Sequence, residues 1–224
     1  MALETVNNPG RDRILTRIKS ALASPSPPRH SRENAPPFPP VGDVLERFQK
    51  ECAVNNTECT LTVDLSDSAR AIAEVLRGIP PGEIFVQDAP ELRHMAASWT
   101  THKIRWSSEP AEKDMRGGPN ECSEATITLA EGLVAMTGSV IVSSACGGRG
   151  AAMVAPLHIV VAKASQLLPD FDAAFAAVKQ RGTALNNSYM CFITGSSRTA
   201  DIEKILVMGA HGPRRLVVTV ALNS

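Results

Sequence analysis

The chain has 224 residues, of which 43% are hydrophobic, so it is long enough to bury one sizeable core. Its 23 basic and 23 acidic residues cancel, which argues against a dedicated nucleic-acid binder. No apolar segment approaches the roughly 20 residues that span a bilayer, and the first residues lack the apolar core of a signal peptide. We therefore expect a soluble, cytoplasmic protein with no membrane span.

The cysteines are odd in number and widely spaced, and no two form a C-x-x-C pair: Cys52, Cys59, Cys122, Cys146 and Cys191. This pattern argues against a zinc site, an iron-sulfur cluster carried by this chain and a secreted disulfide framework. We expect reduced thiols, no metal site and no cofactor bound by this chain. Cys146 is best interpreted as a small buried or half-buried thiol, because nothing in the sequence activates it.

Residues 1–23 form a predicted basic amphipathic helix whose apolar side chains make one stripe: Ile14, Leu15, Ile18, Ala21 and Leu22. Residues 24–40 are rich in proline, which favours extended backbone, so they are interpreted as a linker. The helix is therefore an arm. It is expected to dock on its own domain or on a second subunit of a homo-oligomer, with a foreign partner or a membrane surface as the alternative.

Residues 41–224 are predicted to form the main α/β domain. As far as residue 108, short apolar runs alternate with longer helical patterns, which favours parallel βαβ units. One of these helices covers residues 67–79 and is expected to begin at Ser66 or Asp67.

The middle of the chain changes character. Residues 125–145 and 156–164 are β-branched runs with glycine breaks, and they predict consecutive strands joined through a glycine-rich loop. A helix over residues 170–181 is predicted to end at Gly182, a normal position for glycine just past a helix. Together these patterns predict a three-layer α/β fold with a mostly parallel sheet and a β-rich insertion.

The C-terminal segment, residues 189–222, has the pattern of a βαβ unit with a buried first strand. Gly195 permits a tight turn after that strand, and Ser197 or Thr199 can cap the helix that follows. A Gly-His-Gly-Pro loop then leads into the last strand.

The predicted helix start is a candidate anion site. Its exposed amides, together with Ser196, Ser197 and Arg198, suit a carboxylate or a phosphate. The alternative is a capped junction that binds nothing, because Asp201 and Glu203 in the first turn already complement the helix dipole.

Other segments offer weaker candidates. The Thr137–Ser139 turn lies between two β-type runs, and Arg149 between two glycines offers a guanidinium to an anion, although a plain hairpin tip has the same pattern. His211 is either a general acid or base or a loop residue bonded to backbone. His158 is more simply a strand histidine satisfied by hydrogen bonds than a metal ligand.

Two segments, "TGSVIVSSACGGRGAAMVAPLHIVVAKASQLLPDFDAAF" and "ITGSSRTADIEKILVMGAHGPRRLVVTVAL", resemble the LUD domain of the lactate utilization protein C family. The resemblance implies a fold similar to the sugar-phosphate isomerase and CoA-transferase-like class. It also implies a role in oxidising L-lactate to pyruvate beside iron-sulfur partner proteins, which hold the clusters. A small anionic metabolite is the expected ligand.

Residue chemistry and the resemblance together give these ligand-binding candidates: Thr137, Gly138, Ser139, Arg149, His158, Gly195, Ser196, Ser197, Arg198, Thr199, Asp201 and His211. The catalytic residue is unknown, with His211 and Glu131 as candidates. Many relatives have an acidic residue where this chain has Met136, so this chain is a candidate for binding without turnover.

Two other functions fit the sequence. The first is a free-standing enzyme acting on a sugar-phosphate or CoA-type substrate, which rests on fold analogy. The second is a non-catalytic ligand-binding or scaffolding module that recruits a partner through the basic arm and the proline-rich linker.

Overall fold

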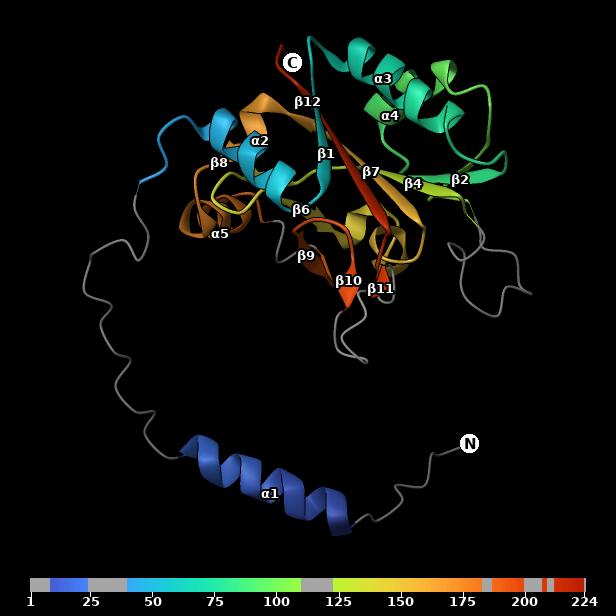
Figure 1. The fold of residues 1–224 in the computed structure, drawn as a ribbon. Coiled ribbons are helices and arrows are strands. Elements are labelled where there is room, and N and C mark those ends of the chain that lie inside the picture. The colour runs from blue at the N-terminus through green and yellow to red at the C-terminus, as the bar shows by residue number, and fades with distance from the viewer. Residues whose placement is uncertain are drawn as a thin grey trace, which may run out of the picture. The chain divides into compact units, whose positions relative to one another are not determined.

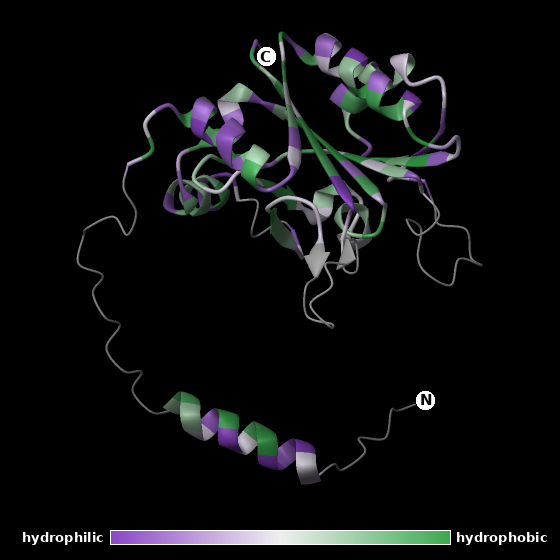
Figure 2. Cartoon of the chain, in the orientation of Figure 1, coloured by the Kyte–Doolittle hydropathy of each residue, from purple (hydrophilic) through white to green (hydrophobic). Residues whose placement is uncertain are grey.

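The computed structural model describes residues 9–23, 40–109, 123–182, 187–199, 207–208 and 212–223. The chain divides into two units, Met1–Pro39 and Pro40–Ser224. In the first unit, helix α1 spans Pro9–Ala23 (Figure 1). Hydrophobic residues recur along α1 between hydrophilic ones (Figure 2), as the sequence pattern predicts.

The second unit is built on a six-stranded sheet in which every neighbouring pair is parallel. In spatial order its strands are β1 (Thr57–Thr62), β12 (Arg215–Ala221), β7 (Leu157–Lys163), β4 (Ala125–Leu129), β2 (Glu83–Val86) and β3 (Lys103–Trp106). The central strands β7 and β12 are buried along almost their whole length, as expected where both faces of a sheet are covered.

Helices α3 (Leu65–Arg77) and α4 (Pro90–Met95), with the short 3-10 helix η1 (Ala96–Ser98), cover one face of the main sheet (Figure 1). Ile72 and Leu76 of α3 belong to the same buried cluster as Ile159 of β7. Trp99 closes this layer, since its indole N–H donates to the Ala69 carbonyl at 3.2 Å. The amphipathic pattern of α3 is therefore satisfied by the sheet beneath it.

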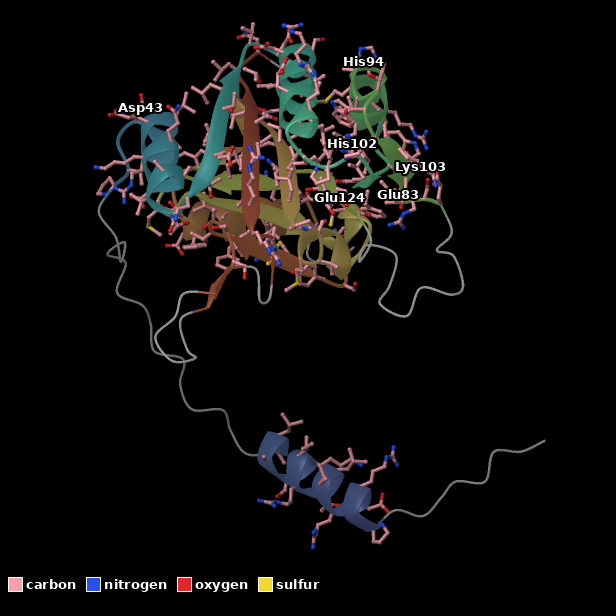
Figure 3. All side chains as sticks on the ribbon, turned by 45° about the vertical axis from the view of Figure 1, so that its right-hand side comes forward. Asp43, Glu83, His94, His102, Lys103 and Glu124 are labelled. Carbon is pink, nitrogen blue, oxygen red and sulfur yellow. The ribbon has the colours of Figure 1, made fainter. Side chains whose placement is uncertain are left out.

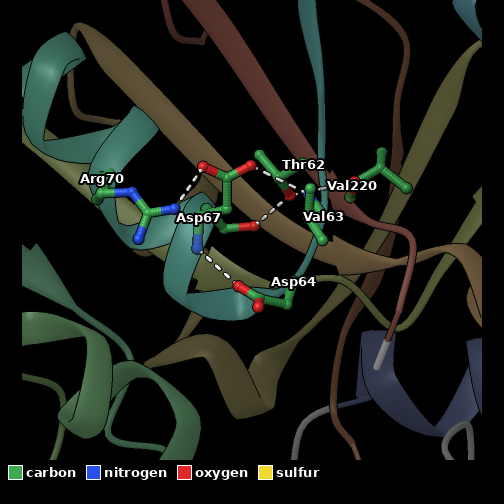
Figure 4. A network of polar contacts seen from close by, with 7 residues as sticks. Thr62, Val63, Asp64, Asp67, Arg70 and Val220 are labelled. Carbon is green, nitrogen blue, oxygen red and sulfur yellow. Dashed lines mark hydrogen bonds and ion pairs between the residues drawn. The ribbon is translucent and has the colours of Figure 1, made fainter.

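Helix α3 begins two residues earlier than predicted. The Asp64 carboxylate accepts a hydrogen bond from the Asp67 amide at 2.8 Å, so Asp64 is the N-cap (Figure 4). Asp67 lies in the first turn, and its carboxylate accepts from the Val63 amide at 3.0 Å. The expectation of a start at Ser66 or Asp67 was wrong because three polar residues in close succession can each cap a helix.

The other face of the main sheet carries helix α2 (Val44–Val54) and a second, four-stranded sheet (Figure 1). The order of that sheet is β8 (Leu167–Leu168), β5 (Gly132–Val134), β6 (Ser139–Ser143) and β9 (Met190–Ile193). Asp43, labelled in Figure 3, caps α2. Phe48 of α2 and Leu133 of β5 pack with Val160 and Val218 of the main sheet.

Helix α5 (Phe171–Gln180) covers the outer side of the second sheet, where Ala174 packs with Val134 and Ile141. It ends as predicted, with Arg181 as the C-cap and Gly182 in a left-handed conformation at φ +69°. The predicted α/β fold, with a mostly parallel sheet and a β-rich insertion, is confirmed.

The C-terminal segment differs from its prediction. Strand β9 pairs antiparallel with β6 in the second sheet, whereas β12 lies in the main sheet, so they do not form one βαβ unit. All four residues of β9 are half-buried rather than buried. An apolar run of four or five residues does not reveal which of two sheets it joins.

Ser197 is not a helix cap, because the residues that follow it are extended; whether Thr199 caps a helix stays a prediction, since residues 200–206 lie outside the described part of the chain. Arg198–Thr199 form strand β10, which pairs antiparallel with β11 (Val207–Met208). The rest of the predicted helix lies outside the described residues. The glycine-rich loop before β7 contains two 3-10 helices, η2 (Ser144–Cys146) and η3 (Arg149–Ala152).

Candidate functional site

The structure brings the two predicted turns together through a chain of hydroxyl groups. The Thr137 Oγ1 and Ser139 Oγ atoms lie 2.7 Å apart, and Ser139 Oγ lies 2.6 Å from Thr194 Oγ1. Thr137 and Ser139 flank the β5–β6 hairpin tip, while Thr194 follows β9. Segments 55 positions apart in the chain therefore meet through one buried serine.

Both turns pack against the end of helix α2, which explains their glycines. Gly138 has φ +64°, and a Cβ there would lie 2.7 Å from the Cys52 amide nitrogen. Gly195 has φ +83°, and a Cβ there would lie 2.2 Å from the Asn55 carbonyl oxygen. The Asn55 side-chain amide donates to the Thr137 carbonyl at 3.1 Å. Only glycine fits such close approaches at positive φ.

The serines after Gly195 lie beside the loop that leads into β12. The Ser197 amide donates to the Pro213 carbonyl at 2.8 Å, and a Cβ on Gly212 would lie 3.2 Å from the Ser197 Cβ. Ser196 is buried, and its Oγ has no hydrogen-bond partner among the described residues. A buried hydroxyl without a partner is unfavourable, so this atom is the best-placed donor for a ligand in the cluster.

We call these residues the amino-edge cluster: Thr137–Ser139, Thr194–Ser197 and Gly212–Pro213. Helix α2 ends three residues before β1 begins at Thr57, and Pro213 precedes β12 by two residues. Because all six strands of the main sheet are parallel, these positions share the edge at which the strands begin. The Thr137, Ser139 and Thr194 hydroxyl groups bond to one another, whereas the buried Ser196 Oγ has no partner among the described residues.

His158 is not part of this cluster's surface. Its side chain is buried inside the main sheet, where Nε2 lies 2.9 Å from Thr128 Oγ1 and Nδ1 has no partner among the described residues. Burial lowers the pKa of His158 to about 4, so the ring is neutral near pH 7. The predicted strand histidine is therefore present, with one of its two nitrogens satisfied.

Glu131 lies at the opposite end of β5 from Met136 and the hairpin tip. Five residues of extended chain separate these positions by roughly 16 Å, so Glu131 cannot replace an acid at position 136. Its Oε1 instead accepts from the Ser143 hydroxyl at 2.7 Å. Met136 packs against the cluster of α5 and the second sheet, and its carbonyl accepts from Arg47 at 3.4 Å.

Cys146 is buried beside Phe85 and Ala151, which confirms the expectation of a small buried thiol. Burial raises the pKa of its thiol to about 11. A thiol of that pKa is almost fully protonated at pH 7, so Cys146 is a poor nucleophile.

Several predicted site residues lie outside what the structure describes. Asp201 and His211 belong to segments whose placement is not described, so their roles stay predictions. The backbones of Arg149, Arg198 and Thr199 are placed in η3 and β10, but their side chains are not described.

Sequence reasoning missed a cavity at the opposite edge of the main sheet. It has a volume of about 220 Å³ and lies where β4 and β7 end, with Leu129 and Lys163 in its wall. Arg181, at the end of α5, and Glu91, in the first turn of α4, also line it. In the sequence, Lys163 has the pattern of an ordinary residue at the end of a strand, and Arg181 that of an ordinary residue at the end of a helix. No local pattern therefore predicts that the two side chains line one cavity.

Over the described part of the chain, no group of three or more His, Cys, Asp or Glu side chains is arranged to hold a metal ion. Likewise, none of the helices described has the length and apolar character needed to cross a membrane.

The fold and the clustered turns define an α/β domain with a parallel main sheet, a β-rich insertion and glycine turns gathered at the amino edge. The LUD domain family model matches residues 45–220, and the chain belongs to this family.

Two relatives are similar over most of the chain. Lactate utilization protein C from Geobacillus sp. (strain WCH70) is 26% identical over 195 residues, which cover 81% of this chain and 79% of that protein. Lactate utilization protein C from Deinococcus radiodurans is 26% identical over 228 residues, which cover 92% of this chain and 93% of that protein.

A solved structure supports the fold. The crystal structure of a DUF162 family protein from Deinococcus radiodurans matches with a TM-score of 0.61 and 21% sequence identity. The match covers 81% of this chain and 99% of that chain. At this identity the likeness concerns the fold alone.

Proposed function

We propose that this chain is a component of an iron-sulfur-dependent system that oxidises L-lactate to pyruvate, and that it binds a small anionic ligand. The observation that carries the proposal is the similarity to proteins named lactate utilization protein C, which extends over 92% of this chain in one case. Membership of the LUD domain family over residues 45–220 supports it.

We assign the iron-sulfur clusters to partner proteins and not to this chain. Cluster-binding proteins hold the iron through closely spaced cysteine thiolates, and none of the five cysteines here forms a C-x-x-C pair. The contribution of this chain is then to bind a ligand or to organise the complex, while electrons pass through the partners.

The amino-edge cluster is the proposed site of the small anion. It joins two segments that carry the family pattern, and Ser196 offers a buried hydroxyl without a partner among the described residues. Arg198 and Asp201 follow Ser196 closely in the chain. A cation and a hydroxyl donor two positions apart in the chain are the residue types that bind a carboxylate such as that of lactate or pyruvate.

Co-purification tests the place of the chain in such a system. The tagged protein is isolated from its native host grown on lactate, and the iron content and absorption spectrum of the co-purifying proteins are measured. Recovery of iron-sulfur proteins is expected. Recovery of a colourless chain by itself would favour a separate ligand-binding protein or enzyme, and turnover of a sugar phosphate by the isolated chain would favour the enzyme.

Calorimetric titration tests the ligand. L-lactate and pyruvate are titrated into the isolated chain and into Ser196→Ala, with Ser98→Ala, an exposed serine of η1, as the matched control. Ser196→Ala is expected to weaken binding, whereas Ser98→Ala is expected to bind like the original protein. Equal affinity in all three proteins would count against the amino-edge cluster.

A further inference from the structure

The cavity at the carboxyl edge of the main sheet has more positive than negative charge. Lys163, Arg181 and Glu91 line it, which gives two cations and one carboxylate. The Lys163 Nζ lies 3.8 Å from the Glu91 Oε1, beyond the length of a hydrogen bond. Glu91 therefore neutralises the ammonium only in part and leaves its donors available.

Arg181 is held in place by a contact that uses only part of its guanidinium group. Its Nη1 donates to the Glu131 carbonyl at 2.7 Å. An arginine side chain has five N–H donors in a fixed plane, and no described carboxylate forms an ion pair with this one. The backbone contact thus fixes the orientation of the group, while its remaining donors are available at the cavity.

Gln166 makes the floor of the cavity rigid. Its Oε1 accepts from the Lys163 amide at 2.8 Å, and its Nε2 donates to the Ala130 carbonyl at 2.6 Å. These two bonds tie the end of β7 to the end of β4, so both ends of the amide are already used. Gln166 positions the site, and recognition of a ligand falls to Lys163 and Arg181.

The rest of the cavity wall is apolar, and the cavity itself is small. Leu65, Leu129 and Val161 line the cavity. Its volume of about 220 Å³ corresponds to about seven water molecules at roughly 30 Å³ each and is below the roughly 300 Å³ at which drug-sized sites begin. The occupant that fits is therefore a small molecule with one charged end and a short apolar body.

The location is the one that parallel sheets use for ligands. In open α/β sheets, ligands bind outside the carboxyl ends of the strands, and Leu129 and Lys163 are the last residues of β4 and β7. We propose that this cavity binds a short aliphatic carboxylate, with its carboxylate between Lys163 and Arg181 and its carbon chain against Leu65 and Leu129. This site is separate from the amino-edge cluster and does not depend on the function proposed for that cluster.

Propionate tests the proposal, with two comparison probes. Propionamide has nearly the same shape without the charge, and inorganic phosphate has the charge without the carbon chain. Each is titrated into the full-length chain and followed by the backbone amide signals of the assigned protein. Propionate is expected to shift the signals of Ala130, Val161 and Lys163, and propionamide is expected to leave them unchanged.

Two substitutions remove the cations. Lys163→Met and Arg181→Gln are each expected to weaken propionate binding about tenfold, because each removes a charge-assisted hydrogen bond. Lys179→Met is the matched control, since Lys179 is exposed in the last turn of α5 and does not line the cavity. It is expected to bind propionate as the original protein does.

Any one of four results would overturn the proposal. The first is equal binding of propionate and propionamide, which would show that the carboxylate charge is not recognised. The second is phosphate binding at least as tight as that of propionate, which would remove the role of the apolar wall. The third is propionate shifts confined to the Thr137–Ser139 turn. The fourth is an unchanged affinity for propionate in Lys163→Met.

Discussion

The Thr128 hydroxyl lies 2.9 Å from the Nε2 atom of His158, and both side chains are buried where the main sheet meets the β-rich insertion. His158 lies on the same face of β7 as Val160, which packs against α2 and the second sheet. Its Nδ1 has no partner among the described residues. A positive charge on this ring would be buried without a counter-charge, so the neutral form is the one the fold selects.

His158 makes the fold sensitive to acid. Burial lowers its pKa in the folded state to about 4, whereas an unfolded histidine titrates near 6.5. The unfolded state therefore binds a proton that the folded state does not, and the free energy of unfolding falls as pH drops from about 6.5 toward 4. The total loss is about 3 kcal/mol. Urea unfolding at pH 7, 6 and 5 measures this slope.

The matched variant for this measurement is His158→Gln, which cannot take up the proton. Its stability is expected to change less between pH 7 and pH 5 than that of the original protein. An equal dependence of stability on pH in both proteins would contradict the assignment of this acid sensitivity to His158. The ring signals of His158 offer a second test: they should not titrate between pH 8 and pH 5 in the folded protein, but they should titrate near 6.5 in concentrated urea.

Gly195 is expected to be the least replaceable glycine of the amino-edge cluster. In Gly195→Ala the new Cβ would lie 2.2 Å from the Asn55 carbonyl oxygen, at a φ of +83° that side chains rarely adopt. We expect a loss of about 3 kcal/mol or more in the free energy of unfolding. Gly42→Ala is the control, because nothing lies within 4 Å of its Cβ position, and it should change stability by less than about 0.5 kcal/mol. Equal effects in urea unfolding would contradict the described packing.

Two cations of β3 share the Glu83 carboxylate but differ in burial. Lys103 and Glu83 are labelled in Figure 3, and Lys103 is 79% exposed, whereas the side chain of Arg105 is only 12% exposed. Arg105→Met leaves Glu83 without its closest partner and is expected to cost about 2 kcal/mol. Lys103→Met is expected to cost less than about 0.5 kcal/mol. Thermal unfolding of the two variants compares them directly.

A second substitution, at residue 83, separates the ion pair from the other contacts of Arg105. In a Glu83→Gln background, the ion pair is already absent, so adding Arg105→Met should cost less than it does in the original protein. A cost that does not depend on residue 83 would mean that Arg105 stabilises the fold through its contact with the Phe85 ring, whose centroid lies 5.0 Å away.

Local patterns were enough to predict much of the fold. The β5–β6 pairing follows from β-branched runs around a Thr-Gly turn, and the end of α5 follows from Gly182. The candidate residues of the Thr137–Ser139 turn and the Gly195 turn come from two family-like segments, not from local physics, and only the folded chain shows that the two turns meet. A hairpin or a helix end depends on residues that are near each other in the chain, and membership of a family shows in a sequence pattern long enough to be specific for that family.

Long-range placement could not be predicted in the same way. The four residues of β9 are apolar enough for either sheet, and in the structure they pair with β6, whereas β12 lies beside β7. The cavity at the carboxyl edge depends on the ends of β7 and α5 meeting in space, as Lys163 and Arg181 do. Neither residue belongs to a motif, so only the folded chain shows the pair.

The cysteines should differ strongly in reactivity. Burial raises the pKa of Cys146 to about 11, whereas the half-buried Cys59 has its pKa lowered by a hydrogen bond from the Cys52 thiol. Because the thiolate is the reactive form, iodoacetamide at pH 8 should modify Cys59 well before Cys146. Timed quenching and peptide mass spectrometry measure both rates, and the same reaction in concentrated urea should remove the difference. Modification of Cys146 as fast as Cys59 in the folded protein would make Cys146 a candidate nucleophile.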